Sequence, residues 1–244
     1  MSVLLEVCVD SPAGLEAAVA GGAGRIELCS ALDLGGLTPS RGMIELAAQQ
    51  AVPVHALIRP RSGGFVYSRS EVDVMLTDIE VARASGLAGV VVGAARSDGG
   101  LDLQVLRRLC EYADGLSVTL HRVFDLVPDP GQALEDAIDL GIDRILTSGG
   151  GVTVLGGLHV ISSLCRQAAG RISILPGAGV TADNVAELIE TTGVSEVHAS
   201  CRTHAGKNDE RLVALGFATD MSRNTSEEQV RALKQAMDGV RVHP

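Results

Sequence analysis

Short apolar runs alternate with longer amphipathic stretches at an even spacing along the whole chain. The runs are rich in Val, Ile and Leu, which is typical of buried parallel strands. They predict eight strands, at residues 4–9, 25–29, 54–59, 89–93, 117–121, 144–147, 172–175 and 194–199.

Between these runs, apolar residues recur three or four positions apart, as on one face of a helix. This spacing predicts helices at residues 12–20, 39–50, 70–85, 103–113, 130–140, 153–169, 182–190 and 226–237. Several connections back to a strand carry glycine, for example Gly86, Gly141 and Gly193, as expected just after a helix end. Eight such units predict an α/β fold, a (β/α)8 TIM barrel that forms a single domain over residues 1–244.

The polar segment 204–225, after the eighth strand, does not fit this alternation. We expect it to be irregular and to insert around the barrel mouth or at a subunit contact. We also expect the chain to form a homo-oligomer.

Composition narrows the classes of partner. The net charge of -10 argues against nucleic acid and anionic membranes as partners, since both require clustered Lys and Arg. No apolar run reaches the ~18–20 residues of a membrane helix, and the first ten residues lack a secretory signal. We expect a cytoplasmic protein whose five cysteines are reduced and serve as packing residues, metal ligands or nucleophiles.

The first two strands repeat one pattern, Leu5-Glu6-Val7-Cys8 and Ile26-Glu27-Leu28-Cys29. Residues two apart in a strand share a face, so each strand presents a carboxylate and a thiol together. Two thiolates in similar register on neighbouring strands could approach one soft ion, and thiolate ligands favour Cu(I) or Zn(II) over hard cations. The alternative is that Cys8 and Cys29 only pack inside the barrel.

The same parity predicts a charged barrel interior. Glu6 and Glu27 would lie there with Arg59 and Arg25, either as an ion-pair network or as part of a ligand pocket. At the end of the fifth strand, His121 is suited to proton transfer, and Asp125 is placed to orient it or a substrate. The candidate catalytic residues are therefore Glu6, Glu27, His121 and Asp125.

Other residues at strand ends are suited to an anion. Arg59 and Arg61 precede a pair of glycines in the same loop and can bind carboxylate or phosphate in bidentate fashion. Glycines after the sixth and seventh strands expose backbone N–H groups near helix N-termini. The candidate anion-binding residues are Arg59, Arg61, Ser148, Gly177, Gly179 and His198.

Taken together, these motifs resemble the CutC family. The matching stretches are 6–11, 21–23, 25–29, 35–40, 58–61, 121–122, 124–125, 145–149 and 198–200. The resemblance implies a cytosolic TIM barrel with a role in copper homeostasis, and Cu(I) binding through Cys8 and Cys29. Two positions depart from the family pattern: Gly24 and Gly64 each stand where an Asp is expected.

Two functions follow from the sequence. The first is copper homeostasis, with Cu(I) held at the barrel mouth by Cys8 and Cys29. The second is acid-base catalysis of the lyase, isomerase or hydrolase type on a small anionic or phosphorylated metabolite, so that enzymatic activity stays an open question.

Overall fold

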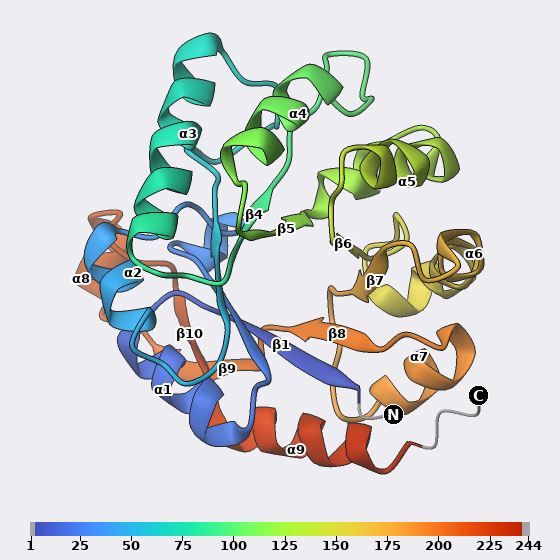
Figure 1. Cartoon of the computed structure of the whole chain (residues 1–244). Coiled ribbons are helices and arrows are strands. Elements are labelled where there is room, and N and C mark those ends of the chain that lie inside the picture. The colour runs from blue at the N-terminus through green and yellow to red at the C-terminus, as the bar shows by residue number, and fades with distance from the viewer. Residues whose placement is uncertain (1–2, 241–244) are drawn as a thin grey trace.

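The computed structural model describes residues 3–240 and contains the predicted barrel (Figure 1). Parallel strands form its inner wall, and helices surround it (Figure 1). The strands are β1 (Leu4–Val9), β2 (Arg25–Leu28), β3 (Val54–Leu57), β4 (Gly89–Val92), β5 (Ser117–Leu120), β6 (Arg144–Thr147), β7 (Ser173–Pro176) and β8 (Glu196–Ala199). The surrounding helices are α1 (Pro12–Gly21), α2 (Arg41–Ala47), α3 (Arg69–Ala84), α4 (Leu103–Tyr112), α5 (Pro130–Asp139), α6 (Leu158–Ala168), α7 (Val185–Thr192) and α9 (Glu227–Asp238).

The strand order confirms the (β/α)8 prediction. Neighbouring strands pair in the order β7-β6-β5-β4-β3-β2-β1-β8, and every ladder in this sheet is parallel. Among the described residues β7 and β8 share no backbone ladder, so the barrel is nearly closed. Three short 3-10 helices, Leu32–Leu34, Arg122–Leu126 and Val154–Gly157, lie in the loops after β2, β5 and β6.

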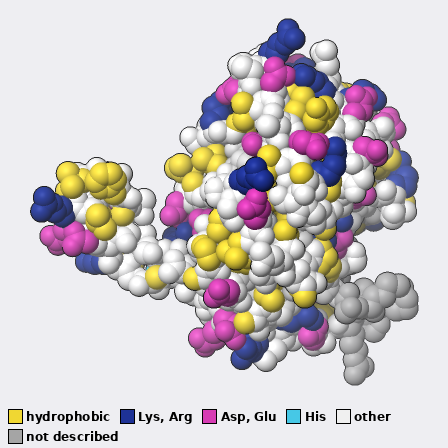
Figure 2. Space-filling model, turned by 60° about the vertical axis from the view of Figure 1, so that its left-hand side comes forward, with side chains coloured by type: hydrophobic (Ala, Val, Ile, Leu, Met, Phe, Trp, Pro, Cys, Tyr) yellow, Lys and Arg dark blue, Asp and Glu magenta, His cyan; other side chains and the backbone are white. Residues whose placement is uncertain are grey.

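The segment after β8 differs from the sequence-based expectation of an irregular loop. Strands β9 (Arg202–Lys207) and β10 (Met221–Thr225) form an antiparallel hairpin that carries the short helix α8 (Glu210–Ala214). We call residues 202–225 the arm; it stands away from the barrel (Figure 2). Its strands are mostly exposed and polar, and therefore lack the alternating apolar residues by which a strand is recognised in a sequence.

A charged layer inside the barrel joins its strands. Arg25 on β2 forms ion pairs with Glu6 on β1 and Glu196 on β8, and Arg144 on β6 lies 3.5 Å from Glu196. The expectation that Arg59 pairs with the interior glutamates is wrong, because its guanidinium binds backbone carbonyls instead. The buried negative charge of Glu6 is therefore neutralised by Arg25, which lies in the same layer of the barrel, as a buried charge requires.

The last helix, α9, packs on α1 at a very close contact. A Cβ atom at Gly21 would lie 2.5 Å from the Cβ of Val230 and 2.9 Å from the carbonyl oxygen of Glu227. We expect Gly21→Ala to lower the free energy of unfolding by about 1–3 kcal/mol, because one added methyl group overpacks this contact. Urea unfolding measures the change.

Gly42, in α2, is the matched control, since a Cβ atom there meets nothing within 4 Å. Gly42→Ala should leave stability unchanged or raise it by about 0.5–1 kcal/mol through its effect on the unfolded chain. Equal destabilisation by the two substitutions would contradict the packing argument.

Candidate functional site

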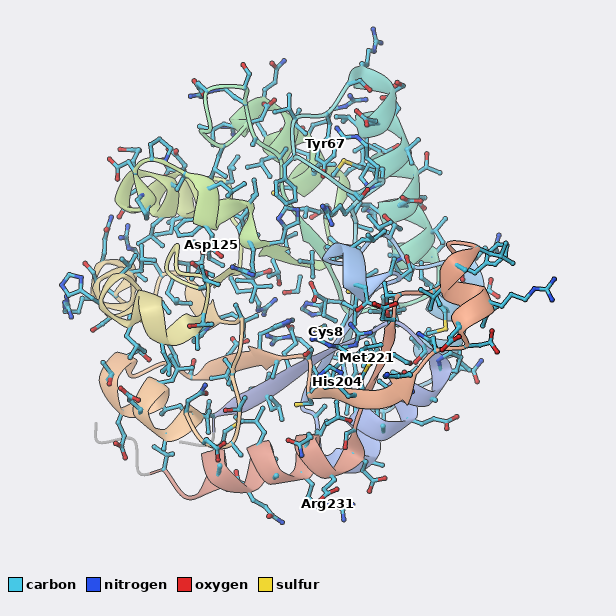
Figure 3. The ribbon with its side chains drawn as sticks, turned by 180° about the vertical axis from the view of Figure 1, so that it is seen from behind. Cys8, Tyr67, Asp125, His204, Met221 and Arg231 are labelled. Carbon is cyan, nitrogen blue, oxygen red and sulfur yellow. The ribbon has the colours of Figure 1, made fainter. Side chains whose placement is uncertain are left out.

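A cavity of about 340 Å³ opens at the carboxyl end of the strands. Active sites of (β/α)8 barrels lie at this end. Cys8, one of the residues lining the cavity, lies in the interior of the barrel (Figure 3). The cavity is lined by Cys8, Glu27, Cys29, Leu32, Gly35, Leu57, Arg59, Phe65, His121, Arg122, Leu146, His198, Ser200, Arg202 and Arg223.

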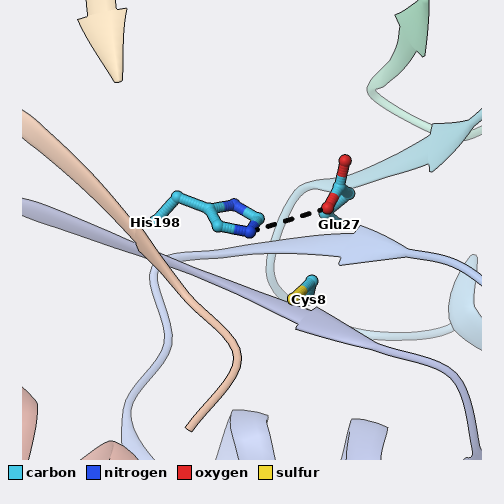
Figure 4. Close-up of side chains that lie close together, drawn as sticks. All are labelled: Cys8, Glu27 and His198. Carbon is cyan, nitrogen blue, oxygen red and sulfur yellow. Dashed lines mark ion pairs between the residues drawn. The ribbon is translucent and has the colours of Figure 1, made fainter. Parts of the chain in front are cut away.

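Three buried side chains from three neighbouring strands converge in this cavity (Figure 4). Cys8 on β1 lies opposite Glu27 on β2 in the strand pairing, and His198 comes from β8 on the other side of β1. One ligand atom from each residue lies within 4.8 Å of the others. The Nε2 atom of His198 is 3.8 Å from Oε2 of Glu27, so sulfur, nitrogen and oxygen donors surround one point.

Glu6 orients the histidine of this cluster. Nδ1 of His198 donates a hydrogen bond of 2.8 Å to Oε1 of Glu6, while Nε2 points toward Cys8 and Glu27. Glu6 has no exposed surface, and its burial alone would raise its pKa. The hydrogen bond from His198 and the charge of Arg25 outweigh that effect and lower the pKa of Glu6, so this residue is a carboxylate.

Burial affects the other groups of the cluster differently. It raises the pKa of Glu27 to about 7, with a contribution from the negative charge of Glu6. Burial also raises the pKa of the Cys29 thiol well above its usual value. Burial disfavours a charged His198, but Cys8 and the two glutamates raise its pKa well above the ordinary value. Glu27 therefore exchanges its proton near neutral pH.

The repeated sequence pattern suggested that Cys8 and Cys29 lie in similar register on their strands. In the structure they do not. The β1–β2 pairing sets Cys8 opposite Glu27, and Cys29 follows at the end of β2, where its N–H donates to Val9. Cys29 shares a small buried cluster with Cys8, but its thiol points to the backbone oxygen of Glu27 at 3.9 Å. The stagger of barrel strands causes this offset, and a sequence repeat does not reveal it.

The two arginines of the β3 loop are used differently. Arg59 lines the cavity and is only 7% exposed, with its guanidinium held by carbonyl groups. Arg61 pairs with Glu71 at the start of α3 and donates to the carbonyl oxygens of Gly64 and Val66. Arg61 is not among the residues that line the cavity, so of this pair only Arg59 joins the site.

His121 and Asp125 do not act on one another. His121 lines the cavity, and its Nδ1 accepts a hydrogen bond of 3.0 Å from the N–H of Val123. Asp125 instead accepts hydrogen bonds from Thr147, Ser148 and Gly150, and pairs with Arg122. Of the two roles expected for Asp125, orienting His121 is wrong, because Asp125 instead joins the ends of β5 and β6; orienting a substrate stays a prediction.

The remaining anion-binding candidates lie around the mouth. The Ser148 hydroxyl bonds to Asp125 and to the carbonyl oxygen of Gly151. A Cβ atom at Gly177 would lie 3.2 Å from His198, so glycine there leaves room for that ring. Gly179, with φ of 76°, borders a second cavity of about 400 Å³ that also reaches His198. Anion binding by Ser148, Gly177 and Gly179 stays a prediction.

Sequence reasoning missed three arginines at the mouth. Arg122 follows β5, and Arg202 and Arg223 belong to the two strands of the arm. Arg202 also pairs with Asp33 at 2.8 Å, which ties the base of the arm to the loop after β2. Arg202 lies three residues after the end of β8 and could have been considered, whereas Arg223 reaches the site only through the hairpin.

The fold and the cavity define a (β/α)8-barrel protein with a Cys, His and Glu cluster at its mouth. Within residues 3–240, no helix has the length and apolar character needed to cross a membrane. Residues 3–203 match the model of the CutC family, and the chain belongs to this family. The arm and α9 lie almost wholly beyond the matched residues.

Individual relatives agree with this assignment. The CutC family protein of Sinorhizobium medicae is 52% identical, covering 98% of this chain and 97% of its own. A solved structure of a CutC protein from Streptococcus agalactiae, named for copper homeostasis, is 32% identical with a TM-score of 0.78; the match covers 81% of this chain and 98% of that one. A phosphoribosylanthranilate isomerase from Thermotoga maritima, 13% identical with a TM-score of 0.60 over 98% of this chain and 100% of its own, shares the fold.

His55 provides a pH test of the buried charged layer. It lies on β3 with only 2% of its surface exposed, and burial lowers its pKa to about 4. The unfolded chain binds this proton near pH 6.5, so the contribution of His55 to stability is present above that pH and is lost as the pH falls toward about 4. From about pH 7 to about pH 5, the wild type should lose roughly 2 kcal/mol more stability than His55→Asn.

Denaturant unfolding at both pH values measures this difference. His159 lies exposed on α6, and His159→Asn should keep the pH dependence of the wild type. If His55→Asn also kept it, His55 would not be the neutral buried ring that the structure describes.

Proposed function

We propose that this protein binds Cu(I) at the barrel mouth and serves copper homeostasis. The observation that carries the proposal is the convergence of the Cys8 sulfur, a His198 nitrogen and a Glu27 oxygen within 4.8 Å. Thiolate and imidazole are ligands that suit copper. Membership of the CutC family, and the naming of the Streptococcus agalactiae protein for copper homeostasis, agree with this chemistry.

Cys8 is the central ligand in this proposal. Its sulfur is the softest donor of the cluster and therefore suits Cu(I) best. Nε2 of His198 provides a nitrogen ligand beside it. Cys29 packs next to Cys8 in the same small cluster and is proposed as a further thiolate, which ligation would deprotonate. Glu27 is a harder donor, and its proton exchange near neutral pH couples copper binding to pH.

Glu6 supports the ligands without touching the ion. Its carboxylate accepts a hydrogen bond from Nδ1 of His198 and so keeps Nε2 directed at the site. Such carboxylate-histidine-metal arrangements fix the ring and raise its basicity. Arg25 in turn holds Glu6 by an ion pair, which links the metal site to the charged layer of the barrel.

Acid-base catalysis has less support from the geometry. It requires a second proton carrier, and burial lowers the pKa of His121 to about 3. The carboxylate of Asp125 accepts hydrogen bonds from the hydroxyl groups of Thr147 and Ser148, and Asp125 is not among the residues that line the cavity. A neutral histidine of this kind donates a hydrogen bond well, but it is a weak base near neutral pH.

We also propose that the protein acts in the cytoplasm as a homo-oligomer. All five cysteines are free, as suits a reducing compartment. The arm carries Leu215 and Phe217 at its exposed end, and Phe217 is 79% exposed. Analytical ultracentrifugation of the wild type and of Phe217→Ser would test whether the arm joins subunits.

Cu(I) titration of the reduced protein against a chromophoric chelator tests the metal site. Cys8→Ser should weaken Cu(I) binding by at least ~100-fold, because it removes the softest ligand. Cys110→Ser is the matched control, since Cys110 lies on α4 away from the cavity, and it should bind like the wild type. Cys8→Ser with unchanged stoichiometry and affinity would refute the assignment, as would Zn(II) displacing bound Cu(I) at equal concentration.

Glu6→Gln tests the supporting role of the carboxylate. It should weaken Cu(I) binding by about 10–100-fold, the usual effect of removing a carboxylate that orients a histidine ligand. Thermal unfolding monitored by circular dichroism establishes whether the variant folds, and His198→Asn provides a second variant that leaves the Glu6–Arg25 pair intact. Full affinity in a folded Glu6→Gln protein would show that Glu6 does not act on the ligands.

A further inference from the structure

The cavity is lined by more arginines than carboxylates, and two of these arginines, Arg59 and Arg223, pair with no carboxylate among the described residues, whereas Arg122 and Arg202 form ion pairs with acids outside the cavity. Four arginines line it, Arg59, Arg122, Arg202 and Arg223, together with a single carboxylate, that of Glu27. A cationic cavity in a chain with a net charge of -10 is a local feature of this mouth.

Arg59 is the most enclosed of the four. No carboxylate lies within salt-bridge distance of its guanidinium in the described part of the chain, although the residue is only 7% exposed. Its NH groups donate to the carbonyl oxygens of Leu34 at 3.0 Å, Gly36 at 2.8 Å and Gly63 at 2.9 Å, while Nε has no partner. A buried cation without an anion is unfavourable, so the carbonyl groups hold Arg59 oriented while its charge remains available.

A neutral donor lies next to this cation. His121 is 5% exposed, and because its Nδ1 accepts from Val123, its proton resides on Nε2. Nε2 has no partner among the described residues. The ring of Phe65 lies 4.9 Å from the His121 ring and 5.1 Å from the Arg59 guanidinium carbon, so the three side chains form one wall.

We propose that the cavity binds a small organic anion, whose oxyanion group is held by Arg59 and His121 and whose apolar body lies against Phe65, Leu32 and Leu57. The shared chemistry is that of a carboxylate or a phosphate ester, both of which match the planar fork of arginine. A volume of about 340 Å³ suits a molecule of this size. Arg202 and Arg223 lie at the base of the arm and line the cavity, so the base of the arm is part of the site.

This anion site does not depend on the copper proposal, because its residues differ from the metal ligands. The test therefore uses metal-free protein, with isothermal titration calorimetry and thermal unfolding at constant ionic strength. The probes are inorganic phosphate, phenyl phosphate and benzoate. Phenyl phosphate or benzoate should bind at millimolar concentration or below, and more tightly than inorganic phosphate, because each adds an apolar body to the oxyanion. Tighter binding of phenyl phosphate would identify a phosphate ester as the group recognised, and tighter binding of benzoate would identify a carboxylate.

Variants locate the site. Arg59→Gln should weaken the preferred probe about tenfold or more, since it removes a charge-assisted contact. Arg223→Gln changes an exposed residue of the arm and should weaken the probe a few-fold without loss of folding. Arg61→Gln is the matched control and should bind like the wild type, because Arg61 is outside the cavity and pairs with Glu71.

Two results would overturn the proposal. One is the absence of binding by all three probes to the folded wild-type protein. The other is equal binding by the wild type, Arg59→Gln and Arg223→Gln, since the anions would then act at other places. Loss of Cu(I) binding in Cys8→Ser with intact anion binding would separate this site from the metal site.

Discussion

The buried charge of Glu6 is the constraint on which this site depends. Its carboxylate has no exposed surface and is acceptable in the interior only because Arg25 and His198 bind it from either side. That requirement fixes the orientation of the His198 ring, and the ring directs Nε2 toward Cys8 and Glu27. One ion pair between neighbouring strands thus supports both the barrel interior and the cluster at its mouth.

The stagger of the strands determines which donors meet. Each of the first two strands carries a glutamate followed two residues later by a cysteine, yet the pairing places Cys8 beside Glu27 and not beside Cys29. The result is a mixed set of sulfur, nitrogen and oxygen donors. Had the two strands been in equal register, the site would present two thiols side by side.

The mouth combines two kinds of chemistry in one cavity. Donor atoms suited to a soft metal lie on β1, β2 and β8, while Arg59, His121 and Phe65 form a wall on the side of β3 and β5. The arm adds two arginines to the mouth, and one of them, Arg223, lies beyond the residues that match the family model. Relatives that share the barrel but differ in the arm would therefore differ in the charge of the mouth.

The sequence by itself determined the barrel, since eight buried aliphatic runs separated by amphipathic stretches leave few other arrangements. It also identified Glu6, Cys8, Glu27, Arg59 and His198 as inward-facing residues, because strand parity is a local property. Only the tertiary structure decided that Arg25 neutralises Glu6, that Asp125 bonds to Ser148, and that Arg223 reaches the mouth. These outcomes depend on strand stagger and hairpin pairing, which arise from contacts between segments far apart in the chain.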